Sequence, residues 1–116
     1  MDITEKRVDE IAVFALSMRE GQRGSLDGFQ QVIKERLQKG EAMFVLNLAD
    51  CRWIDSQGLG ELVKSLVAVM RQGGNLKLAA MPQRLQAIFS ITNLTQVFEI
   101  FETEAAALAS FEVRTT

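Results

Sequence analysis

Residues 51–60, which read Cys-Arg-Trp-Ile-Asp-Ser-Gln-Gly-Leu-Gly, join the most apolar strand candidate of the chain to its most apolar helix candidate. The preceding run, residues 43–48, is Met-Phe-Val-Leu-Asn-Leu, a short apolar stretch typical of a strand covered on both faces. After the junction, apolar residues recur at helical spacing: Leu59, Leu62, Val63, Leu66, Val67 and Met70. We therefore expect this strand-to-helix junction to carry the function.

The predicted helix start combines capping side chains with little side-chain cover. Asp55 and Ser56 are both good N-cap residues, and Gly58 and Gly60 leave the first turn open. A helix start has free backbone N–H groups and a partial positive charge. An anion placed there would be stabilised.

Residues 54–60, Ile-Asp-Ser-Gln-Gly-Leu-Gly, resemble the signature of STAS-domain proteins of the anti-sigma factor antagonist family, which is Asp-Ser-small-Gly-Leu-Gly after an apolar strand. The resemblance continues through residues 73–78, 91–94 and 97–101, so it covers roughly residues 40 to 111. It implies an α/β fold with a mixed sheet of four or five strands and about four helices packed mainly on one face. A fold alone does not fix a function.

The resemblance assigns roles to the helix start. Ser56 falls on the serine whose phosphorylation controls partner binding in the family. The implied partner-binding residues around it are Asp55, Gln57, Gly58, Leu59 and Gly60. Gln57 stands where relatives often carry Ser or Thr, so a second phosphate acceptor is absent at that position.

The residues themselves leave simpler readings open. Ser56 and Asp55 can each be explained as helix caps. Gly58 and Gly60 can be explained by the tight turn from strand to helix. Leu59 either packs into the core or forms an apolar contact for a partner.

By resemblance, the chain is an antagonist that binds an anti-sigma serine kinase and thereby frees a sigma factor. The kinase would end the binding by phosphorylating Ser56, and a serine phosphatase would restore it. The alternative is a constitutive STAS subunit of a lipid-transport ATPase or a signalling scaffold. The intact Asp55-Ser56 pair favours the switch.

Length and composition limit the other possibilities. The 116 residues, 47% apolar and 24% charged, fit one domain spanning residues 1–116. A net charge of −2 argues against nucleic acid or an anionic membrane as the main partner. The sequence shows no apolar run of about 20 residues and no signal-peptide pattern at its start, so we expect a cytoplasmic protein.

The rarest residue types argue against catalysis. The chain has no histidine, so the usual general base for a serine or cysteine nucleophile and the commonest metal ligand are both missing. Cys51 is the only cysteine, which excludes an internal disulfide and a cysteine metal cluster. Gly73 and Gly74 are not followed by Lys-Ser or Lys-Thr, so they predict a helix end and not a phosphate loop. We expect a binding protein without cofactor or metal.

The remaining patterns predict alternating strands and helices. Cys51 is expected to be buried, and Trp53 to be a core or edge aromatic residue. Strands are expected near residues 3–7, 11–16, 43–48, 75–80 and 96–101. A loop is expected at 19–24, and helices from 25 or 26 to 38, from 56 to 71 or 72, from Pro82 onward and over 104–111.

Overall fold

One five-stranded sheet organises the protein, and the computed structural model describes residues 2–19 and 26–111. In chain order, the elements are β1 (Asp2–Val8), β2 (Ile11–Ser17), α1 (Asp27–Gln38), β3 (Met43–Asn47), α2 (Ser56–Arg71), β4 (Asn75–Ala79), α3 (Gln83–Ile91), the short 3-10 helix η1 (Leu94–Gln96), β5 (Ile100–Phe101) and α4 (Glu104–Ala109).

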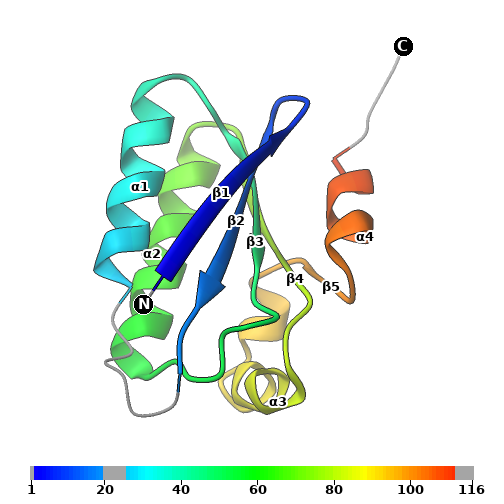
Figure 1. Cartoon of the computed structure of the whole chain (residues 1–116). Coiled ribbons are helices and arrows are strands. Elements are labelled where there is room, and N and C mark those ends of the chain that lie inside the picture. The colour runs from blue at the N-terminus through cyan, green and yellow to red at the C-terminus, as the bar shows by residue number, and fades with distance from the viewer. Residues whose placement is uncertain (1, 20–25, 112–116) are drawn as a thin grey trace.

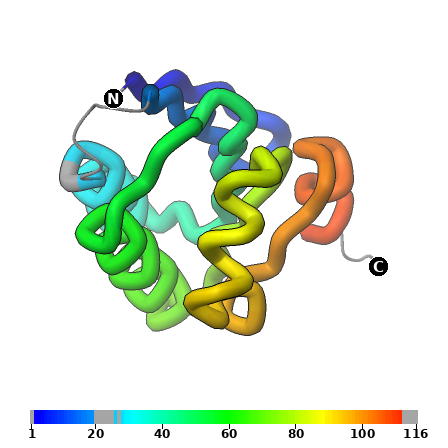
Figure 2. The backbone as a smooth tube through the Cα atoms, turned by 90° about the horizontal axis from the view of Figure 1, so that it is seen from below, coloured from blue at the N-terminus to red at the C-terminus, as the bar shows by residue number. Residues whose placement is uncertain are grey.

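The strands lie in the order β1-β2-β3-β4-β5 (Figure 1). β1 and β2 form an antiparallel hairpin, and every later pair is parallel. Parallel neighbours need a crossover, and α1, α2 and α3 provide one each. Because each of these helices follows the carboxyl end of a strand, all three begin at the same end of the sheet, the end seen in Figure 2.

Three helices cover one face of the sheet and the fourth covers the other, as Figure 1 shows for α1, α2 and α4. The larger core cluster includes Phe14 from β2, Phe29 from α1, Leu62 from α2 and Phe89 from α3. The smaller cluster, under α4, consists of Ile11, Val13, Val45, Ala79 and Ala107. The expected mixed sheet with helices mainly on one face is therefore confirmed.

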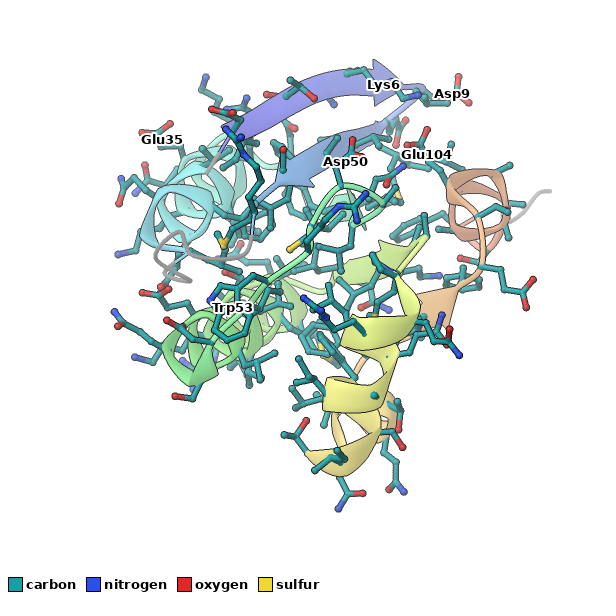
Figure 3. All side chains as sticks on the ribbon, turned by 60° about the horizontal axis from the view of Figure 1, so that its bottom comes forward. Lys6, Asp9, Glu35, Asp50, Trp53 and Glu104 are labelled. Atoms are coloured by element: carbon teal, nitrogen blue, oxygen red, sulfur yellow. The ribbon has the colours of Figure 1, made fainter. Side chains whose placement is uncertain are left out.

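Polar contacts hold both ends of α4 on the second face. At its start, the Glu104 carboxylate accepts hydrogen bonds from Lys6 Nζ at 2.7 Å and Asn47 Nδ2 at 3.0 Å, and Figure 3 shows Lys6 and Glu104 together. Beyond its end, Lys77 Nζ donates to Ser110 Oγ at 2.8 Å and lies 4.1 Å from the centre of the Phe111 ring. Only 6% of Lys77 is exposed.

Glu104 makes this attachment sensitive to acid. The hydrogen bond from Lys6, followed by that from Asn47, lowers the pKa of the Glu104 carboxyl. The resulting stabilisation is present above the pKa of an unfolded glutamate and disappears as pH falls through the lower folded pKa. We expect wild type to be more stable than Glu104→Gln at pH 7 and this difference to shrink in acid, as measured by urea unfolding at both pH values. A difference that stays constant with pH would contradict this role for the charged carboxylate.

Three expectations need correction. The helix expected over 104–111 ends at Ala109, because residues 110 and 111 form a turn. The strand expected over residues 96–101 is reduced to Ile100–Phe101, because residues 94–96 form η1 and Phe98 turns into the core with 4% exposure. The first helix begins at Asp27, slightly later than expected. The expected loop at 19–24 lies outside the described residues apart from Arg19.

Across the described residues, no helix is both long and apolar enough to cross a membrane.

Candidate functional site

The connector from β3 to α2 is tied to the end of β2. Met18 and Cys51 form an isolated parallel bridge, in which Met18 N–H donates to the Asp50 carbonyl and Arg52 N–H to the Met18 carbonyl. Ile54, which is 3% exposed, anchors the connector in the core. The start of α2 is therefore fixed at the carboxyl end of the sheet.

Asp55 is the residue that caps α2. Its backbone is extended, and its Oδ1 accepts a hydrogen bond from the Gly58 N–H at 2.9 Å. The sequence had left both Asp55 and Ser56 as cap candidates. Ser56 is instead the first residue within the helix, and its side chain is exposed. The hydroxyl of Ser56 is thus presented to solvent at the positive end of the helix.

The other predicted site residues differ in exposure. Gln57 and Gly60 are exposed, and a Cβ placed on Gly60 would have no atom within 4 Å apart from its chain neighbours and the adjoining helix backbone. Gly58 is buried. Leu59 is half-buried and packs against the larger core cluster, so part of its side chain serves the core and part faces outward.

Glu61 is a site feature that sequence reasoning missed. Glu61 is 7% exposed, and its carboxylate accepts a hydrogen bond from the Leu26 N–H, next to the start of α1. Leu26 provides no side-chain cap for α1, so a carboxylate from α2 stabilises that helix start instead. In the sequence, Glu61 looks like an ordinary solvent-facing residue, and no local pattern points to its burial. The contact links the residue that precedes α1 to the second turn of α2.

Cys51 and Trp53 are structural residues, as predicted. Cys51 is completely buried, and this burial raises the pKa of its thiol to about 11, so the thiol stays protonated near neutral pH. Trp53 is half-buried against the larger core cluster, next to the start of α2 (Figure 3).

Comparison with known families places this site in context. The family model of the STAS domain matches residues 23–107. The chain belongs to the STAS domain family. The predicted signature therefore lies within the matched region of a STAS domain, at the start of α2.

Two curated relatives and two solved structures are similar to this STAS domain. A Thermotoga neapolitana protein named "Putative anti-sigma factor antagonist TM1081 homolog" is 36% identical over 72% of this chain and 74% of its own. The anti-sigma-B factor antagonist of Bacillus subtilis is 42% identical over 46% of this chain and 49% of its own.

The NMR structure of TM1081 superposes with a TM-score of 0.80 at 26% identity, covering 90% of this chain and 84% of that one. The Bacillus protein SpoIIAA in its phosphorylated form gives a TM-score of 0.72 at 15% identity, covering 96% of this chain and 100% of that one. At this identity, the second likeness establishes the shared fold alone.

Proposed function

We propose that this STAS domain is an anti-sigma factor antagonist that binds an anti-sigma serine kinase through the start of α2 and so frees a sigma factor. The observation that carries the proposal is the exposed Ser56 hydroxyl at a helix start whose cap is supplied by Asp55. A kinase can modify this hydroxyl without removing the cap. The names of the two curated relatives support the same function.

Phosphorylation of Ser56 would act on binding through charge. A phosphate adds about −1.5 to −2 charges, and the helix start tolerates them in the free protein. Against a docked partner, the same charge would lie uncompensated in a contact from which water is excluded. A change from almost fully bound to almost fully free needs about 5.5 kcal/mol of differential affinity, which the desolvated phosphate would have to supply. A serine phosphatase would restore binding.

The exposure of each residue around Ser56 indicates whether it would contact the partner or support the helix start. Gln57, Gly60 and the outward part of Leu59 would contact the partner directly. Asp55 and the buried Gly58 would support binding through the geometry of the helix start, since the hydrogen bond between them forms the cap.

Gly60→Arg tests the contact surface. The new side chain would extend into open space on the exposed side of α2, so we expect a melting temperature close to that of wild type. Kinase binding should weaken at least about tenfold, because the arginine would block close approach of the partner. Calorimetric titration and a thermal melt measure the two effects.

Leu59→Asp provides the contrast, because Leu59 packs against the core. It should lower both the melting temperature and the affinity. If Gly60→Arg binds as wild type does, the proposed surface is wrong.

The decisive experiment is incubation of the full chain with the purified anti-sigma serine kinase of the same organism and ATP, followed by phosphopeptide mapping. The expected result is one phosphate, on Ser56. An unmodified Ser56 would contradict the switch and favour a constitutive STAS subunit of a transporter or scaffold.

A further inference from the structure

A largely exposed seam runs along α2 from Ser56. Its members recur at intervals of four and three residues: Ser56, Gly60, Val63, Val67 and Met70. This spacing keeps them on one side of the helix, over about 21 Å of its length. We call this set the α2 seam.

Apart from Val63, the seam lies away from the side of α2 that packs in the core. Leu62, Leu66 and Val69 are buried, whereas 43% of Val67 and 57% of Met70 is exposed. Val63 is half-buried and packs against the larger core cluster, so only part of its side chain faces outward. The apolar residues of α2 therefore form a buried side and an adjoining open side that continues to Ser56.

We infer that the α2 seam is a docking surface for a helix of the kinase that binds at Ser56, an inference that rests on the proposed function. Ser56 is itself the first seam residue, so the contact proposed at the helix start continues directly along α2. Spacing of four and three residues is the pattern with which helices pack at shallow angles. Gly60, with open space at its Cβ position, lets a partner helix approach closely.

The charges beside the seam specify the partner helix further. Lys64 follows Gly60 by four residues and Arg71 follows Val67 by four, so both flank the seam, and both are exposed. Glu61, the remaining charged residue of α2, is buried. The complementary helix would carry an apolar stripe with carboxylates along the side that meets Lys64 and Arg71.

The test replaces the two most exposed apolar seam residues with neutral side chains of similar shape, Val67→Thr and Met70→Gln, in the full chain. Calorimetric titration with the purified anti-sigma serine kinase of the same organism should show a Kd about tenfold higher, because the new hydroxyl and amide would be desolvated in the contact. The melting temperature should change little, since both side chains are exposed.

Val97→Thr is the matched control, because Val97 is 49% exposed and lies outside α2. Its Kd should stay within about twofold of wild type. An unchanged Kd for the seam variant, with Ser56→Asp still weakening binding, would overturn the seam and leave the proposed function standing.

Two further outcomes would also overturn the inference. If the wild-type chain does not bind the kinase at all, the proposed function is wrong and the seam inference is wrong with it. If sedimentation shows that the seam variant loses self-association while its kinase affinity is unchanged, the seam belongs to a contact with a second copy of this chain.

Discussion

Ser56→Asp is expected to bind the anti-sigma serine kinase at least about 100-fold more weakly than wild type, a loss of about 2.7 kcal/mol. The carboxylate places a permanent charge at the proposed contact, where phosphate would lie, although it imitates a phosphate incompletely. The fold should be unaffected, because Asp55 caps α2 and an additional carboxylate is favourable in the first turn of a helix. Calorimetric titration gives the affinity, and urea unfolding gives the stability.

Ser56→Ala is the control for this substitution. It removes the phosphate acceptor but adds no charge, so we expect wild-type affinity that persists in the presence of ATP. Its stability should fall by less than the roughly 1 kcal/mol typical of a lost cap, because Asp55 makes the cap hydrogen bond. Wild-type affinity in Ser56→Asp would show that charge at this position does not control binding.

Gly74→Ala is expected to be the most damaging single-methyl substitution near the sheet. An added Cβ would lie 1.9 Å from the Ala42 carbonyl oxygen and 2.5 Å from the Ala42 Cβ. The same carbonyl accepts a hydrogen bond from the Asn75 N–H at 2.9 Å, where β4 begins beside β3. Relief of the clash must move backbone at the start of both strands, so we expect a loss of about 3 kcal/mol or more. Urea unfolding measures it.

Gly60→Ala is the matched control for stability. It adds the same methyl group within α2, where the new Cβ has no atom within 4 Å apart from its chain neighbours and the adjoining helix backbone. Alanine favours a helix over glycine by roughly 0.5–1 kcal/mol, so this variant should be slightly more stable than wild type. If Gly74→Ala and Gly60→Ala have equal stability, the close approach at Ala42 is not a constraint on the fold.

The sequence was most informative where pattern and local chemistry agree. The strand predicted over 43–48 and the helix predicted from 56 correspond to β3 and α2 within one residue at the predicted limits, because apolar runs, caps and glycines all point to the same boundaries. Gly73 has the positive φ of 83° that suits a helix end, as the predicted stop required.

Tertiary contacts explain what the sequence could not predict. Lys77 alternates with leucines and so reads as a solvent-facing strand residue, but α4 covers that face and buries it. Glu61 is buried by a contact with Leu26, thirty-five positions away in the chain. The observed strand is shorter than the one expected at 96–101, because Phe98 is buried in the core. The alternation of polar and apolar residues does not indicate this burial. The choice of Asp55 over Ser56 as the cap depended on backbone geometry.

The placement of α4 also has a consequence for synthesis on the ribosome. The five strands of the sheet precede α4 in the chain. Ala107 of α4 nevertheless completes the smaller core cluster on the second face. Until α4 emerges, Ile11, Val13 and Val45 lack this cover, while the three helices of the opposite face have already been made. In the nascent chain, one face of the sheet therefore keeps open apolar surface after the helices of the other face have been made, and exposed apolar surface of this kind favours aggregation.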